Sequence, residues 1–375
     1  MFKRRNLVMF SILIILLSII IYINLYSYQS TSSNSNLVKE IKLMTHLNKY
    51  TDSEYSINVL RVNNNIVYGT IETNKDNHFL FTTVGIFSYD IATDELTFKN
   101  FLPNQRIINF ITIDSNLYYC ILSSEENSTF KWELYLDNWN AFDINKNMLL
   151  DSGYIKNLLD YPRMIYLEKD SAVISFKKQE DDKIEHKICK VDSKGNIKEL
   201  ISDNGYLHKN EGILLYNDDN LLSTNYKIYY TILNSDNSQS LISFDLNSLT
   251  QDTLFTNKDE EMAISSFIIS NNYIFLQLTD KENDLNSTNI ILNKEREQVY
   301  SFNSQMFTFA NLIDHDTILF HNSGDIWQLF ACEDFTLQNI DLNINSIFPK
   351  YFVLSKNQIL IQTFEKQFYS VNLEI

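Results

Sequence analysis

A short polar turn that leads into an apolar strand recurs seven times along the chain. This repeat limits the possible folds more than any other feature. The strands begin at Ile66, Leu117, Ala172, Ile228, Ile274, Ile318 and Ile359. A second series of apolar runs, most of which end in Asp or Asn, has the markers Asp90, Asp143, Asp192, Asp245, Asn293, Cys332 and Asn372, which lie 39 to 53 residues apart. The two series interleave, one member of each per repeat.

A period of about 40–50 residues with four strands per repeat is typical of the blades of a β-propeller. One four-stranded sheet cannot bury both of its faces, so such sheets stack around a common axis. Apolar residues make up 44% of the chain and aromatic residues 13%, which is enough for a large core, and 3 Cys are too few for a disulfide scaffold. The sequence therefore predicts an all-β, seven-bladed β-propeller, with six and eight blades left open.

The two ends of the repeat region complement each other. The sequence stops at Leu373-Glu374-Ile375, directly after the seventh marker, where the other repeats continue into an outermost strand. The apolar run 37–44 precedes the first repeat and can supply that strand, which would remove a free sheet edge. We therefore expect one propeller domain over residues 37–375, closed by its N-terminal strand.

In this period and hairpin pattern the chain resembles bacterial extracytoplasmic β-propellers of the TolB-like kind. The resemblance covers residues 37–375 and implies a fold and a location outside the cytoplasmic membrane. It carries no functional residues across.

The first 26 residues have the pattern of a membrane anchor. Lys3, Arg4 and Arg5 precede a run without charge, Leu7 to Tyr26. Twenty residues in a helix span about 30 Å, the thickness of the bilayer hydrocarbon, and the basic residues favour a cytoplasmic N-terminus. The alternative is a cleaved signal peptide, although no small-residue cleavage site follows the run. We predict a tip and anchor over 1–26, a flexible spacer over 27–36, and a propeller outside the cell membrane.

Turn chemistry is unusual, because the chain has 7 Gly but 45 Asn. A propeller needs about two dozen tight turns, and Asn accepts the left-handed backbone conformation best after Gly. We therefore expect Asn to replace Gly in the turns, as at Asn64-Asn65 and Asn271-Asn272.

Composition and motifs exclude several activities. A formal net charge of −16 without clustered Lys or Arg argues against nucleic-acid binding. No nucleophile elbow, phosphate-binding loop or zinc-type Cys pair is present, and the apolar settings of Cys120, Cys189 and Cys332 predict buried free thiols. The densest ligand-capable cluster is Asp314-His315-Asp316 with His321. It indicates either a metal or acid–base site or an ordinary solvated turn.

Acidic turns suggest a candidate binding surface. The loop between the two middle strands lies on the same face of the disc in every blade. It reads as long and acidic or amide-rich in blades 1 to 5, and as tight in blades 6 and 7. The candidate rim residues are Glu125, Glu126, Asp181, Asp182, Asp236, Asp280, Glu282 and Asp284. The rim is either a plain solvated surface or a site for a cationic partner or bridging Ca²⁺.

The sequence is compatible with two functions. The first is a non-catalytic binding or sensing module for a protein, peptide or glycan partner. The alternative is a cell-surface hydrolase or lyase that acts on carbohydrate or peptide through carboxylates at the central channel. A pair of carboxylates, or a carboxylate and a His, in a channel pocket would favour the enzyme.

Overall fold

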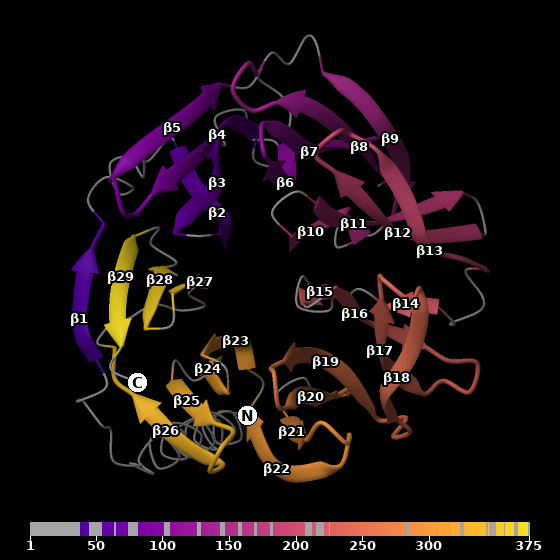
Figure 1. The fold of residues 1–375 in the computed structure, drawn as a ribbon, viewed down its shortest axis with the longest axis vertical. Helices are drawn as coiled ribbons and strands as arrows, with labels where there is room; N and C mark the ends of the chain where they lie inside the picture. Colours follow the sequence, from indigo (N-terminus) through magenta and orange to yellow (C-terminus); the bar gives the residue numbers. More distant parts are fainter. Residues whose placement is uncertain are drawn as a thin grey trace, which may run out of the picture.

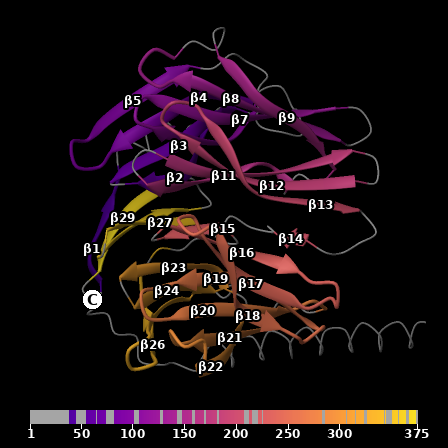
Figure 2. The same ribbon diagram turned by 45° about the vertical axis from the view of Figure 1, so that its right-hand side comes forward.

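The described strands form seven antiparallel sheets arranged in a ring (Figure 1), which Figure 2 shows obliquely. The computed structural model describes residues 38–44, 55–63, 65–73, 82–100, 106–125, 129–142, 147–156, 160–168, 171–180, 183–206, 212–214, 221–224, 226–282, 286–305, 307–314, 316–322, 326–342, 344, 350–355, 357–363 and 367–373. The chain is an all-β, seven-bladed β-propeller, as the repeat predicts.

The blades follow one another along the chain, and each runs from an inner strand to an outer one. Blade 1 is β2 (Tyr55–Asn63), β3 (Ile66–Thr73), β4 (Thr82–Asp90) and β5 (Glu95–Asn100). Blade 2 is β6 (Arg106–Ile113), β7 (Asn116–Ser124), β8 (Phe130–Asn138) and β9 (Met148–Ile155). Blade 3 is β10 (Arg163–Glu168), β11 (Ser171–Glu180), β12 (Lys183–Asp192) and β13 (Ile197–Tyr206).

Blade 4 has its inner strand in two pieces, β14 (Gly212–Leu214) and β15 (Leu221–Thr224), which both pair with β16 (Lys227–Leu233). It continues with β17 (Gln239–Asp245) and β18 (Thr250–Asn257). Blade 5 is β19 (Met262–Ile269), β20 (Ile274–Asp280), β21 (Asn286–Leu292) and β22 (Gln298–Gln305). Blade 6 is β23 (Phe307–Asp314), β24 (Thr317–Asn322), β25 (Trp327–Ala331) and β26 (Thr336–Ile340). Blade 7 is β27 (Lys350–Ser355), β28 (Gln358–Gln362), β29 (Phe368–Leu373) and β1 (Val38–Leu43).

The two sequence series correspond to the two middle strands of the blades. The first marks the start of the second strand, and the second marks the end of the third. Asp90 and Asp245 close β4 and β17, and their carboxylates accept hydrogen bonds from amides of the following turn. In blade 2 the chosen marker is wrong. Asn138 ends β8 and accepts the amides of residues 140 and 141, whereas Asp143 lies outside the described residues.

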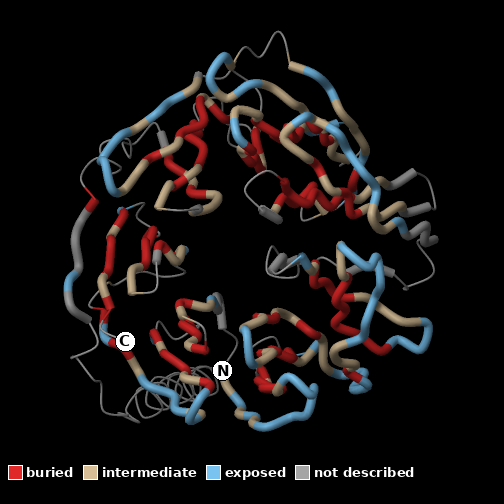
Figure 3. The backbone as a smooth tube through the Cα atoms, in the orientation of Figure 1, coloured by how far each residue is buried: buried red, intermediate tan, exposed pale blue. Residues whose placement is uncertain are grey.

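The core consists of seven apolar clusters, and each contains side chains from two neighbouring blades. Aromatic rings contact one another across several of these interfaces: Trp132 lies 5.2 Å from Phe176, Phe275 lies 5.1 Å from Phe320, and Trp327 lies 5.1 Å from Tyr351. Buried residues accordingly concentrate in the inner and middle strands, and exposed ones on the outer strands (Figure 3). The described residues thus place the core between blades, where neighbouring sheets cover one another's faces.

The ring closes through the start of the described chain. The strand β1 pairs antiparallel with β29, from Val38 opposite Leu373 to Leu43 opposite Tyr369. Next to β1, Met44 is 8% exposed and packs in the cluster between blades 7 and 1. The outermost strand of blade 7 therefore comes from the opposite end of the sequence.

Predictions about the N-terminal region fall outside this structure. The proposed anchor over 1–26 and the spacer over 27–36 lie outside the described residues. Within the described part of the chain, no helix is long and apolar enough to cross a bilayer.

Asparagine supplies fewer left-handed turn residues than expected. Asn65 and Asn237 have positive φ, but so do Asp94, Asp114, Tyr226, Leu249, Arg296, Phe335 and Gly195 among the described residues. Asn271 and Asn272 do not; there the Ser270 hydroxyl accepts the amides of residues 272 and 273. The expectation that Asn replaces Gly is therefore wrong for most of these turns. Side-chain acceptors at the start of a hairpin stabilise it, and the cost of about 1–2 kcal/mol for a left-handed residue is tolerated at its end.

Deletion of residues 38–43 tests the closure of the ring. We expect one cooperative thermal transition whose midpoint is lower by roughly 5–10 °C, because blade 7 loses its outer strand and the packing of Met44 is disturbed. Differential scanning calorimetry of the full-length chain would measure it, with a six-residue deletion inside 27–36 as the control. An unchanged main transition would show that β1 is a peripheral attachment.

Candidate functional site

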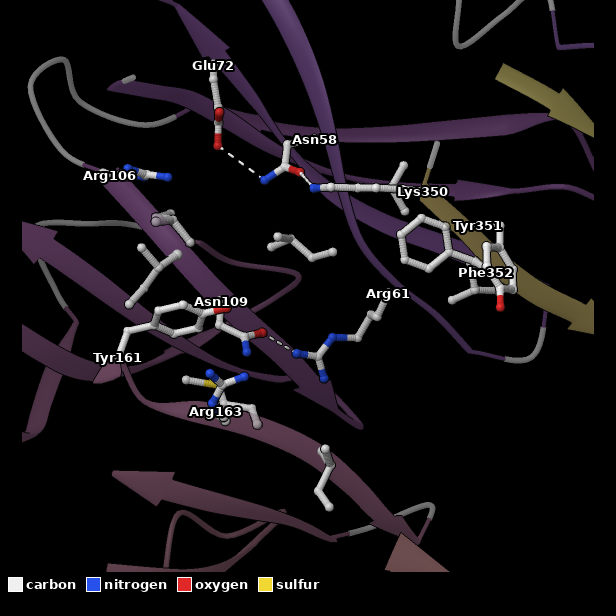
Figure 4. A pocket seen from close by; sticks show the side chains of 17 residues that line it. Asn58, Arg61, Glu72, Arg106, Asn109, Tyr161, Arg163, Lys350, Tyr351 and Phe352 are labelled. Atoms are coloured by element: carbon white, nitrogen blue, oxygen red, sulfur yellow. Dashed lines mark hydrogen bonds between the residues drawn. The ribbon is translucent and has the colours of Figure 1, made fainter. Parts of the chain in front are cut away.

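A cavity of about 540 Å³ lies among the inner strands of four successive blades, 7, 1, 2 and 3. Its described lining comes mainly from β27, β2, β6 and β10 (Figure 4). Because the ring brings blade 7 beside blade 1, residues from both ends of the propeller share this cavity. Its volume is within the range of ligand-binding pockets.

Four polar side chains of the lining occupy the same level of their blades. Each of them lies opposite the fifth residue of its blade's second strand. The pairs are Lys350 with Gln362, Asn58 with Thr70, Asn109 with Cys120, and Arg163 with Ser175. The register of four different sheets thus places one hydrogen-bonding side chain per blade around the cavity.

Two more basic residues lie on either side of this level, each displaced by two residues along the neighbouring second strand. Arg106 is opposite Leu122, two residues further along β7, and Arg61 is opposite Tyr68, two residues earlier along β3. Among the described lining residues, the basic ones are Arg61, Arg106, Arg163 and Lys350, and Glu72 is the sole carboxylate. The lining therefore carries an excess of positive charge.

Glu72 is held by a hydrogen-bonded chain that connects blades 1 and 7. Its Oε1 accepts a 3.0 Å hydrogen bond from the Thr70 hydroxyl and a 3.5 Å bond from Asn58 Nδ2. Lys350 Nζ in turn donates to Asn58 Oδ1 at 2.8 Å. Burial raises the pKa of the Glu72 carboxyl above its ordinary value, while the Thr70 hydroxyl and the Arg106 charge oppose this rise.

The other side of the cavity is organised around Asn109 of blade 2. The Arg61 guanidinium donates a hydrogen bond to Asn109 Oδ1 and so connects blade 1 to blade 2. In blade 3, the Arg163 guanidinium lies 5.1 Å from the centre of the Tyr161 ring, a cation–π distance, and Arg163 is only 4% exposed. Stacking and burial hold this guanidinium in place.

The predicted acidic rim is described only in part. Glu125, Asp236, Asp280 and Glu282 lie in or beside the connections between middle strands, as the sequence predicts, and away from the cavity lining. Asp236 accepts the Ser238 hydroxyl at 2.6 Å and the Ser238 amide at 3.0 Å, and these bonds lower the pKa of its carboxyl. Glu126, Asp181, Asp182 and Asp284 lie outside the described residues. A binding role for the rim stays a prediction.

The expected difference in loop length between blades is wrong. Five residues separate the middle strands of blades 2, 4, 5 and 7, four separate those of blade 6, and eight those of blade 1. In blade 3 the separation is two residues, because Gln179 and Glu180 continue β11 and pair with Ile184 and Lys183 of β12. Polar residues extend a strand wherever it projects beyond the core, so polarity alone does not identify a loop.

In the Asp and His cluster of blade 6, Asp316 and His321 are buried and do not form a solvated turn. Asp316 is 9% exposed and accepts hydrogen bonds from Ser270 at 3.0 Å and Asn272 at 2.8 Å, both in blade 5. His321 is 1% exposed, and its ring lies 4.6 Å from that of Trp327. His315 lies outside the described residues, and the described ones contain no group of three metal-ligating side chains. Asp316 instead connects blades 5 and 6.

Cys120, Cys189 and Cys332 are buried free thiols, which confirms that prediction. Burial raises the pKa of Cys189 to about 11 and of Cys332 to about 12, so both thiols stay protonated at neutral pH.

Sequence reasoning missed the cavity, although a signal was present. Arg106, Arg163 and Lys350 are each the first residue of an inner strand. Comparison of the same strand position across repeats would have shown basic residues in three blades that share the cavity.

Comparisons with known proteins support the fold. No protein-family model matches the chain, and no curated protein matches it by sequence. A solved structure of YCF48 bound to D1 peptide is similar over 89% of this chain and 97% of that chain, with a TM-score of 0.54 and 10% identity. Sqt1 from Saccharomyces cerevisiae is similar over 91% and 99%, with a TM-score of 0.51 and 10% identity.

Oligopeptidase B from Leishmania major is similar over 85% of this chain but only 47% of its own length, with a TM-score of 0.50 and 9% identity. At such low identities these likenesses show a shared β-propeller fold and assign no family.

The pH dependence of stability tests the environment of Glu72. Because the pKa of the Glu72 carboxyl is raised in the folded state, the folded protein binds this proton more tightly than the unfolded protein does. The contribution of Glu72 to stability is therefore greatest below the ordinary pKa of a Glu carboxyl and is lost as pH rises through the folded-state pKa. We expect Glu72→Gln to melt higher than the wild type near neutral pH and the gap to close near pH 4. Thr70→Val, which removes a donor to the carboxylate, should move this change to higher pH. If the melting temperature of the wild type instead rises relative to that of Glu72→Gln as pH rises, the Arg106 charge affects the pKa of Glu72 more than burial does.

Proposed function

We propose that the chain is a non-catalytic β-propeller that binds a protein or peptide segment in the channel cavity. The observation that supports this proposal most is the convergence of Lys350, Asn58, Asn109 and Arg163 from four blades on one cavity. Side chains that converge from separate blades give a ligand several independent contacts. YCF48, which has a similar fold, was solved with a bound peptide.

The described lining favours a binding function over a hydrolase or lyase activity. Glycoside hydrolysis through carboxylates needs a pair of them on opposite sides of the scissile bond. The described lining contains only Glu72, whose carboxylate is occupied by hydrogen bonds within blade 1. Apolar walls from residues such as Val62, Ile108 and Phe352 alternate with the polar groups, a combination typical of recognition sites.

We also propose that a single helix over residues 7–26 tethers the propeller to the outer side of a bacterial cell membrane. The support is the uncharged run and the three basic residues before it. The resemblance to TolB-like propellers agrees with this location. The cavity would then face partners outside the cytoplasm.

A random peptide library selected on the full-length chain tests the binding function. We expect enriched peptides whose binding falls at least about tenfold in the cavity-filling variants Val62→Trp and Ile108→Trp, since an indole excludes ligand from a pocket of this size. Leu337→Trp, on the exposed side of blade 6, is the matched control and should bind as the wild type does.

Two cavity variants are used because either substitution could disturb packing, and each is scored only if it melts as the wild type does. Peptides that bind equally well to both folded cavity variants would contradict a binding site in this cavity.

A further inference from the structure

The charge of the cavity is opposite to that of the molecule. The chain carries 47 acidic and 31 basic residues, whereas the described lining carries four basic residues and one carboxylate. A set of charged residues drawn at random from this chain would contain more acidic than basic side chains. The gathering of basic side chains on four adjacent inner strands therefore concentrates positive potential in a partly enclosed space, where water screens it less than at the surface.

The basic residues lie at three levels of the cavity. Lys350 of blade 7 and Arg163 of blade 3 share one level, which is also that of Asn58 and Asn109. Arg106 of blade 2 lies beyond this level on one side, and Arg61 of blade 1 lies beyond it on the other. Basic groups on four blades and at three levels suit a ligand with more than one negative group. A segment with two or more acidic side chains has this property, whereas a single small anion would engage only some of them.

Within the described residues, Arg106 keeps a donor that is not yet satisfied. The Nε of Arg106 is buried and has no hydrogen-bond partner in the described part of the chain. A guanidinium has five donors in a planar fork that matches a carboxylate. Glu72 attracts Arg106 electrostatically but accepts its hydrogen bonds from Thr70 and Asn58 instead. The Arg106 guanidinium is thus attracted to the Glu72 carboxylate, but Glu72 does not occupy all of its N–H donors.

The remaining lining suits the rest of a peptide. Apolar and aromatic surface in the lining comes from Ile108, Ile165, Tyr161 and Phe352. A bare inorganic anion gains nothing from such walls, but the alkyl parts of Glu side chains and their apolar neighbours do. Asn109, whose Oδ1 accepts from Arg61, adds an Nδ2 group that can donate to a peptide carbonyl.

We propose that the cavity selects an acidic peptide segment, in which carboxylates alternate with apolar side chains and bind to the four basic residues of the described lining. This inference rests on the proposed binding function and names its ligand class.

Fluorescence anisotropy with two labelled eight-residue peptides tests the inference on the full-length chain. One alternates Leu and Glu, and the other alternates Leu and Gln. We expect the Glu peptide to bind at least about tenfold more tightly, because hydrogen bonds between charged groups are the stronger ones. Its affinity should fall as salt is raised.

Variants assign the effect to the cavity. Arg106→Gln should weaken binding of the Glu peptide by about tenfold and leave the Gln peptide unchanged, while Arg106→Lys should weaken it less. Arg296→Gln removes the same charge at the exposed turn between β21 and β22, where Arg296 pairs with Asp252, and should have no effect. Arg106→Lys keeps the test decisive if Arg106→Gln fails to fold.

The possible failures are distinguishable. Equal binding of both peptides, lost in Val62→Trp, would overturn the acidic selectivity and leave the binding function intact. Library peptides that depend on the cavity but are neutral or basic would do the same. Absence of any cavity-dependent peptide would overturn both proposals. Binding of phosphatidylglycerol vesicles through Arg106, without binding of the Glu peptide, would show that the anionic partner is a membrane surface.

Discussion

The packing of each blade against its two neighbours is the interaction on which the rest of this structure depends. A four-stranded sheet exposes two apolar faces, and the seven described core clusters each bury one face against the next blade. Stacking in a closed ring covers every face only if the last blade meets the first. The cluster that contains Met44 joins those two blades, and the pairing of β1 with β29 completes blade 7. Cooperative stability and the placement of blade 7 beside blade 1 thus have the same cause.

The cavity is a consequence of that ring. Inner strands converge on the axis, so their side chains there need not pack in a core and can carry charge. Lys350 and Asn58 are 292 residues apart in sequence, but Lys350 Nζ lies 2.8 Å from Asn58 Oδ1. The hydrogen bonds from Lys350 to Asn58 and from Arg61 to Asn109 run between blades and orient the basic groups. A stable ring therefore gives the cavity a fixed arrangement of donors, which favours recognition without a large rearrangement of the protein.

Local physics made the blades predictable from sequence. Middle strands are buried on both faces and read as unbroken apolar runs, such as Leu117–Leu122, and hairpins begin with Asp or Asn acceptors such as Asp245. The cavity was not predictable in this way, because it depends on which blades become neighbours and on register between sheets. The same limit explains Asp316, which looks like a turn residue but bonds to Ser270 and Asn272 of the adjacent blade. It also explains the turn between β11 and β12, where polar residues continue the strands.

Arginine footprinting in the presence of a bound peptide shows directly whether a partner occupies the basic cavity. Phenylglyoxal would modify arginines of the full-length chain with and without a peptide from the library selection, and mass spectrometry would quantify each site. We expect the peptide to protect Arg106 and Arg61 in the cavity and to leave Arg296 on the outer turn as reactive as before. Unchanged reactivity of Arg106 and Arg61 in a chain saturated with bound peptide would contradict this expectation.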